Sequence, residues 1–314
     1  MPLEKPAVRR FSHEAMATVF EILIAGKDEA YAGQAARAAF DEIDRIERLF
    51  TRFDPSSELC RISRLRPGAS LPVGVETVHV LGLASFVQSE TGGAFDPNYR
   101  AAAARPSGRP GREPRPLNRL LRVEHTGRGF AVTRMKSGAA GQALDLDLGA
   151  VGKGFALDCA LGVLRDWAVD NVLLHAGTST ALGHGPGPGG ARRGRGWPVG
   201  AGATAGKAAG PGRVFLRNGA LSGSGTEVKG EHVVDPRTGR PARGHRAAWA
   251  AHSSAAASDA LSTAFMVMQT GEVANFCGRH PEVWALVKTG PETCRMFNAG
   301  AAAENRPARR RRRR

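Results

Sequence analysis

Cysteine is scarce in this chain of 314 residues, which has only four. Cys60, Cys159, Cys277 and Cys294 lie far apart and form no Cys-x-x-Cys pair. Zinc sites and the disulfide frameworks of small secreted proteins both need cysteines at closer, repeated spacings. The sequence therefore favours neither, and it predicts a protein of a reducing compartment.

Long apolar runs are missing as well. No segment approaches the roughly 20 apolar residues of a membrane-spanning helix, so we expect no membrane span. A twin arginine, Arg9-Arg10, lies near the start, but Glu14 and Glu21 follow it in an alternating, strand-like pattern that is unlike an export signal. Because no cysteine near the start offers a lipid anchor, we expect the protein to be cytoplasmic.

Acidic residues are outnumbered, 29 against 44 lysines and arginines, and the formal net charge is +15. A basic balance of this size can indicate a nucleic-acid partner. Seven of the arginines, however, lie at the C-terminus, at Arg306 and from Arg309 to Arg314, and no aromatic residue interleaves them for base stacking. Such a run stays solvated. We therefore predict a disordered arginine-rich tail over 301–314 and no specific nucleic-acid partner.

Apolar residues make up 42% of the chain, which is typical of a globular protein. We assign residues 1–300 to one domain, built as two intimate lobes. Apolar periodicity predicts its main elements. The predicted helices are 30–50, 75–90, 154–167 and 257–268, and the predicted strands are 18–25, 120–124, 129–134, 145–148, 171–175, 197–199 and 283–288, with an irregular loop over 101–118. They follow no regular βαβ period, which indicates an α+β fold of mixed β-sheets flanked by helices.

The segment 141–158, GQALDLDLGAVGKGFALD, has the features of a phosphate site. Asp145 and Asp147 are two residues apart on a predicted strand and share one face of it. A glycine-rich turn with Lys153 follows, and a helix begins directly after that turn. Free amides at a helix N-terminus, together with a lysine, favour an anion. A plain strand–turn–helix corner with a surface lysine explains this segment about equally well.

The segment 258–268, SDALSTAFMVM, places Asp259 and Thr263 four residues apart. On a helix these two side chains share a face, one turn apart. A carboxylate and a hydroxyl suit a hard cation such as Mg²⁺, which takes oxygen ligands. An N-terminal helix carboxylate favoured by the helix dipole is the plainer explanation.

The segment 231–242, EHVVDPRTGRPA, has a turn at Asp235 preceded by His232 on a short strand. A histidine that titrates near neutral pH can take a proton from an attacking hydroxyl. An ordinary edge-strand histidine fits this segment as well.

The segment 91–100, TGGAFDPNYR, frees its backbone with Gly92 and Gly93. Phe95 offers a flat surface, and Asp96 can accept hydrogen bonds from an adenine or flavin edge. Taken alone, the segment predicts only a loop.

In chain order these segments resemble the FAD:protein FMN transferase family, also called the ApbE family. The matching elements are Met16-Ala17-Thr18, TRFDPSSEL (51–59), TGGAFDP, DLGAVGKGFALD, a late Ser-Gly, HVVDPRTG and SDALSTA. The resemblance extends from about 11 to 290. It implies a T-fold-like, two-lobed architecture with FAD as the donor substrate.

The resemblance also implies which residues contact FAD. The positions that line the FAD pocket are Met16, Phe53, Ala94, Phe95 and Asp96. Asp147 and Lys153 match positions that hold the ribose or pyrophosphate side of the cofactor.

Metal and catalytic roles are implied in the same way. Asp259 and Thr263 match ligands of Mg²⁺, with Mn²⁺ possible, joined by the backbone carbonyl of Ala150. His232 matches a histidine that resembles the general base and belongs with the cofactor-binding positions, and Asp235 supports its loop.

The activity implied by the resemblance is Mg²⁺-dependent transfer of FMN from FAD to a Ser or Thr hydroxyl of an acceptor flavoprotein, with release of AMP. The acceptor is expected to carry a motif of the D-x-S/T-G-A-S/T kind. Two alternatives remain, a FAD pyrophosphatase and a non-catalytic FAD-binding homologue. The second is favoured by residues 177–180, GTST, where the family has a Gly-Gly-Asp or Gly-Gly-Asn element.

Overall fold

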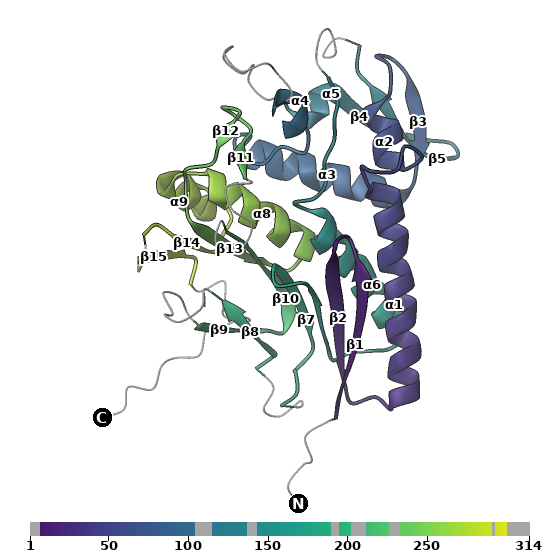
Figure 1. Cartoon of the computed structure of the whole chain (residues 1–314), viewed down its shortest axis with the longest axis vertical. Coiled ribbons are helices and arrows are strands. Elements are labelled where there is room, and N and C mark those ends of the chain that lie inside the picture. The colour runs from purple at the N-terminus through teal and green to yellow at the C-terminus, as the bar shows by residue number, and fades with distance from the viewer. Residues whose placement is uncertain are drawn as a thin grey trace, which may run out of the picture.

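The computed structural model describes residues 7–103, 115–136, 143–189, 195–201, 212–225, 233–290 and 293–299. Within these residues the largest feature is an eight-stranded sheet in which every neighbouring pair is antiparallel (Figure 1). Its strands, in spatial order, are β1 (Val8–Ala15), β2 (Thr18–Ala25), β6 (Val172–Ala176), β7 (Thr180–His184), β10 (Asn218–Gly225), β13 (Ala247–His252), β14 (Trp284–Lys288) and β15 (Cys294–Phe297).

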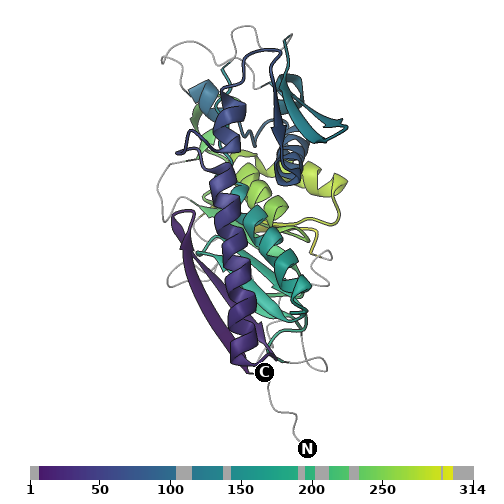
Figure 2. The same ribbon diagram turned by 90° about the vertical axis from the view of Figure 1, so that its right-hand side faces the viewer.

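Three helices cover one face of this sheet, namely α1 (Glu29–Phe50), α6 (Gly152–Asp166) and α8 (Ala255–Val267). Figure 2 shows them next to one another. The alternation along β2 sends Phe20, Ile22 and Ile24 into the core beneath them, while Val19 stays exposed. The buried face of α1 begins with small alanines, which let this long helix lie close to its neighbours. No helix in the described part of the chain is long and apolar enough to cross a membrane.

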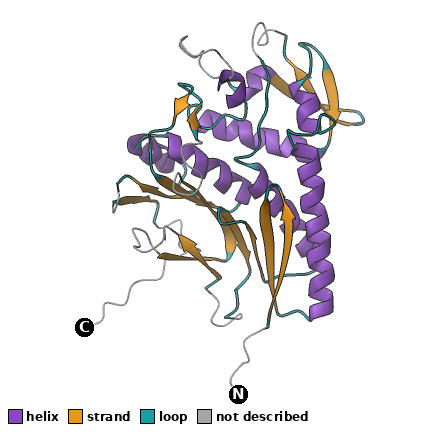
Figure 3. Ribbon diagram, in the orientation of Figure 1, coloured by secondary structure: helices purple, strands orange, loops and turns teal. Residues whose placement is uncertain are grey.

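A smaller group of elements lies at one end of α1 (Figure 3). It has a three-stranded sheet in the order β3-β5-β4, and its elements are α2 (Glu58–Ser63), β3 (Ser70–Val73), α3 (Val75–Glu90), α4 (Tyr99–Ala103), α5 (Leu117–Leu120), β4 (Leu121–Thr126) and β5 (Gly129–Arg134). The irregular loop predicted over 101–118 is therefore wrong at both ends, because short helices occupy them. The middle of that loop lies outside the described residues.

The opposite face of the large sheet is partly covered by a two-stranded ribbon, β8 (Trp197–Ala201) and β9 (Gly212–Leu216). A second apolar cluster lies there and includes Trp197, Leu216 and Leu221. Three further elements complete the described chain: β11 (Val234–Asp235), β12 (Arg240–Pro241) and α9 (Thr270–Arg279).

The α+β prediction is confirmed, with antiparallel sheets and flanking helices throughout the described residues. The assignment of 1–300 to one domain stays a prediction, and the tail 301–314 lies outside the described residues. Three strands at the centre of the large sheet, β7, β10 and β13, were not predicted. Their sequences are rich in alanine, glycine and serine, which have little intrinsic preference for strands, so the neighbouring strands decide their conformation.

The strand predicted over Asp145–Leu148 is wrong, because this segment forms neither helix nor strand. Its backbone bonds go to the loop after α3 instead. The amide of Asp147 donates to the carbonyl of Pro97 at 2.8 Å, and the amide of Asp145 donates to the side-chain oxygen of Asn98 at 2.8 Å. A loop and its asparagine thus supply the partners that a neighbouring strand would otherwise provide.

The turn between β1 and β2 predicts a stability change. Met16 and Ala17 both have positive φ, 49° and 55°, as a two-residue type I′ hairpin turn requires. Because this conformation strains a residue that has a Cβ atom, Ala17→Gly should raise the free energy of unfolding by about 1 kcal/mol. Urea denaturation measures the change. The matched control is Ala38→Gly within α1, which should lower the free energy of unfolding by about 1 kcal/mol. If both variants lose stability, the backbone at Ala17 is not strained.

Candidate functional site

The carboxylate of Asp259 lies at the centre of the candidate site, on the second turn of α8. The residue is 4% exposed, and groups from α6 and β7 contact its carboxylate. Its Oδ2 accepts a hydrogen bond from the Gly154 amide of α6 at 3.2 Å and lies 3.4 Å from Lys153 Nζ. Its Oδ1 accepts from Thr180 Oγ1 of β7 at 3.3 Å, and Thr180 in turn accepts from Ser222 of β10 at 3.1 Å. The buried charge is thus held by a cation, an amide and a hydroxyl pair.

Thr263 lies one turn further along α8, on the same side as Asp259, as the spacing predicts. Its hydroxyl donates to the backbone carbonyl of Asp259 at 3.3 Å and lies 3.4 Å from Ser224 Oγ of β10. Ser224 also lies 2.9 Å from the hydroxyl of Ser262. Besides the Lys153 ammonium and the Gly154 amide, the groups near Asp259 and Thr263 are thus hydroxyl and carbonyl oxygens, which are the atoms that a hard cation prefers.

The carbonyl of Ala150, the third predicted ligand, lies in the turn that precedes α6. In an ordinary first helical turn the Gly154 amide would bond to the carbonyl four residues earlier, but here it donates to Asp259. Among the described residues no group of three His, Cys, Asp or Glu side chains is able to hold a metal. The oxygen set fits a cation that takes its remaining ligands from phosphate and water, as Mg²⁺ does.

Asp147 lies at the turn that leads into α6. Its Oδ1 accepts from the Gly149 amide at 2.8 Å, its Oδ2 accepts from the Tyr99 hydroxyl at 3.3 Å, and the Arg52 guanidinium lies 3.6 Å away. Arg52 stacks on the ring of Phe53, 4.2 Å from its centroid, and that ring is 79% exposed. The structure therefore links predicted residues that lie about a hundred positions apart, through Arg52 and Tyr99, which were not predicted.

Asp96 is buried at the end of the glycine loop after α3. Its Oδ1 accepts from Gln88 Nε2 and from the Asn98 amide, both at 2.8 Å. Burial raises the pKa of Asp96 to about 6. Ala94 and Phe95, the predicted neighbours in the cofactor pocket, are buried in the main core. Asp96 is therefore the polar group that this loop offers.

Comparison with known proteins decides the family. The family model described as the ApbE family matches residues 16–287. The chain belongs to the ApbE family. No curated protein sequence matches it.

Solved structures similar to this ApbE-family chain establish its fold. The apo form of the Pseudomonas stutzeri flavinyl transferase ApbE has 20% identity and a TM-score of 0.72, over 95% of this chain and 97% of that one. The Vibrio cholerae flavin transferase ApbE has 17% identity and a TM-score of 0.71, over 95% and 100%. The Thermotoga maritima ApbE protein has 22% identity and a TM-score of 0.72, over 95% and 99%.

Other predicted residues of this ApbE-family chain lie outside the network around Asp259 and Asp147. Met16 is in the β1–β2 turn and packs against the main core. The carboxylate of Asp235 accepts two bonds from Arg237 Nε and Nη2, at 3.0 and 3.2 Å, and Arg237 also reaches Glu272. This arrangement stabilises the turn that Asp235 begins. His232 lies outside the described residues.

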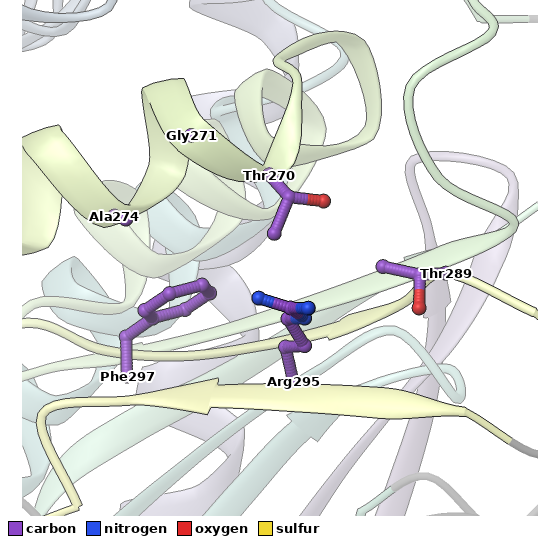
Figure 4. Close-up of a pocket in the computed structure, with 6 residues that line it drawn as sticks. All are labelled: Thr270, Gly271, Ala274, Thr289, Arg295 and Phe297. Atoms are coloured by element: carbon purple, nitrogen blue, oxygen red, sulfur yellow. The ribbon is translucent and has the colours of Figure 1, made fainter.

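A pocket of about 370 Å³ lies between α9 and strands β14 and β15 (Figure 4). Its lining residues are Thr270, Gly271, Ala274, Thr289, Arg295 and Phe297. None of them is a predicted site residue. The Thr270 hydroxyl is already paired with His245 Nε2, at 3.1 Å. We therefore place the candidate site at Asp259 and Lys153, and not in this pocket.

Because the pKa of Asp96 is raised, a substitution that removes the charge of this side chain should stabilise the folded protein, by an amount that depends on pH. An acidic group whose pKa is raised by folding destabilises the folded state when it is ionised. This destabilisation disappears at pH values below the pKa of the group in the unfolded chain, which is near 4. Asn keeps the accepting oxygen, so Asp96→Asn should raise the free energy of unfolding by about 1–3 kcal/mol near pH 7 and by almost nothing near pH 4.

Urea titrations at the two pH values test this expectation. The control is Asp166→Asn at an exposed position of α6, which should show no gain that depends on pH in this way. An equal effect of Asp96→Asn at both pH values would show that the charge of Asp96 is not what destabilises the fold.

Proposed function

We propose that this chain transfers FMN from FAD to a Ser or Thr hydroxyl of an acceptor flavoprotein and releases AMP. Membership of the ApbE family supports the proposal, as do neighbours whose names describe them as flavin transferases. The observation that carries it is the buried carboxylate of Asp259, which faces Lys153 and the N-terminus of α6 among oxygen donors. Oxygen groups beside a lysine and a helix N-terminus suit a diphosphate that is bound together with a cation.

FAD would lie along the residues that join the two groups of elements. Asp96 would accept from the amino edge of a ring, and Phe53 would offer a stacking face beside Arg52. Asp147, held by Tyr99 and the Gly149 amide, would accept from ribose hydroxyls. Met16, Ala94 and Phe95 would shape the pocket from the core side.

Lys153 would bind the diphosphate directly. Its ammonium now lies 3.0 Å from the Gly149 carbonyl and 3.4 Å from Asp259, so a small side-chain movement exchanges either oxygen for a phosphate oxygen. The amides at the start of α6 add the partial positive charge of a helix N-terminus. Both groups favour the negative charge of the substrate.

Asp259, Thr263 and the carbonyl of Ala150 would hold Mg²⁺, and Mn²⁺ takes the same kinds of ligand. The bound ion neutralises charge at the diphosphate. The bonds from Thr180 and the Gly154 amide fix the Asp259 carboxylate before substrate arrives, so little reorganisation is needed during the reaction.

The transfer itself needs a base at the acceptor hydroxyl. In this proposal the acceptor oxygen bonds to the phosphorus of the FMN half, and the bond from that phosphorus to the oxygen of the AMP half breaks. The hydroxyl proton passes to His232. Asp235, through its pair with Arg237, would hold the loop that carries this histidine.

Asp259→Ala tests the proposal. With FAD, Mg²⁺ and an acceptor that carries a D-x-S/T-G-A-S/T motif, the wild type should add one FMN to the acceptor, as mass spectrometry detects. The variant should transfer at least about 100-fold more slowly, because an electrostatic contact to the reacting phosphate is lost. Asp166→Ala, also on a helix but exposed, should transfer as the wild type does. Normal transfer by Asp259→Ala would refute the metal assignment.

A non-catalytic FAD-binding homologue is a second candidate, favoured by the residues at 177–180, and hydrolysis of FAD is the other alternative. Thr180 contacts the proposed metal ligand where this chain departs from the family pattern. Water in place of the acceptor would release AMP and free FMN. Chromatography of a reaction without acceptor separates the cases: free FMN with AMP indicates a hydrolase, whereas bound FAD without AMP in either reaction indicates a binding homologue.

A further inference from the structure

The N-terminus of α8 rests on a carboxylate from another helix. Asp158, on the second turn of α6, accepts from the amides of Ala255 and Ala256 at 2.8 and 3.0 Å and from the Ser254 hydroxyl at 2.7 Å. These are the first amides of α8, which have no partner within their own helix. Asp158 therefore ties α8 directly to α6.

A second contact between the same two helices runs in the opposite direction. One turn further along α8, Asp259 accepts from the Gly154 amide, in the first turn of α6 and one turn before Asp158. Each helix thus places a carboxylate at the N-terminus of the other, where the partial positive charge favours an anion. The helices touch at Gly154, because a Cβ atom there would lie 2.2 Å from the Ala255 carbonyl oxygen.

Capping alone does not require Asp158. Ser254, the residue directly before α8, already caps this helix, because its hydroxyl oxygen accepts from the Ala257 amide at 3.2 Å. A serine at this position supplies the usual capping stabilisation. What Asp158 adds is a bond between two helices, and that bond fixes how far α8 is displaced along α6 and how it is rotated.

We propose that Asp158 is a positioning residue for the site, which holds Asp259 and Thr263 of α8 opposite Lys153 and Ala150 at the start of α6. The inference rests on the proposed function, because it assigns Asp158 to the same cation and diphosphate site. Asp158 itself contacts neither. It acts through the position of α8 along α6. A shift of α8 would move the oxygens of Asp259 and Thr263 away from the Ala150 carbonyl, with which they would bind one ion.

The variant that tests this is Asp158→Asn. It keeps the volume of the side chain, but its amide nitrogen cannot accept, so at least one of the three bonds is lost. With Mn²⁺ alone as the probe, titrated into the full chain and followed by electron paramagnetic resonance, the dissociation constant should rise about 10- to 100-fold. In the FMN transfer assay, the concentration of Mn²⁺ at half-maximal rate should rise by a similar factor.

A second variant separates positioning from loss of stability. Leu164→Ala removes a fully buried side chain from the later part of α6, so it should lower the melting temperature. At a temperature where all variants remain folded by circular dichroism, it should bind Mn²⁺ as the wild type does. The inference is overturned if Asp158→Asn binds Mn²⁺ with wild-type affinity, or if Leu164→Ala weakens binding as much.

The same experiment distinguishes the two proposals. A wild type that binds Mn²⁺ but transfers no FMN refutes the proposed function, while the comparison of Asp158→Asn with Leu164→Ala still decides the positioning role. A wild type that binds no Mn²⁺ overturns the inference, because there is then no metal site for Asp158 to position.

Discussion

The structure of this site depends on one buried charge, the carboxylate of Asp259. Removing a carboxylate from water is unfavourable unless hydrogen bonds and an opposite charge replace the water. Here a lysine and a backbone amide from the start of α6 do so together with a threonine hydroxyl from β7. The helices α6 and α8 and the strand β7 must therefore meet at one point, and the rest of the fold is consistent with that requirement.

Small residues make this meeting possible. Gly154 lets the backbones of α6 and α8 touch, and α8 begins with three alanines that keep its first turn narrow. Beneath α8, the central strands β7 and β10 present hydroxyls where a typical sheet would present branched apolar side chains. Thr180, Ser222 and Ser224 thus place oxygens under α8 at positions where branched side chains would fill volume.

The second half of the site comes from the smaller group of elements. The segment before α6 is bonded to the loop after α3, which brings Asp147 next to the loop of Asp96. In the proposed function, a dinucleotide would contact both, with its diphosphate near Lys153. Similarity to ApbE structures at 17 to 22% identity shows that this fold tolerates extensive change in sequence.

The sequence by itself determined the long helices, strands such as β2, β6 and β14, and the segments that carry polar chemistry, because these depend on local periodicity and on short spacings such as Asp259 to Thr263. It did not reveal β7, β10 or β13, nor that Asp145–Leu148 lies outside any sheet, because those outcomes depend on which neighbours supply hydrogen bonds. Thr180, Arg52 and Asp158 lie in segments that the sequence singled out, but the sequence predicted no role for any of the three. Their importance arises only from partners that lie about 80 to 100 positions away along the chain, and such contacts exist only after the helices and sheets have packed.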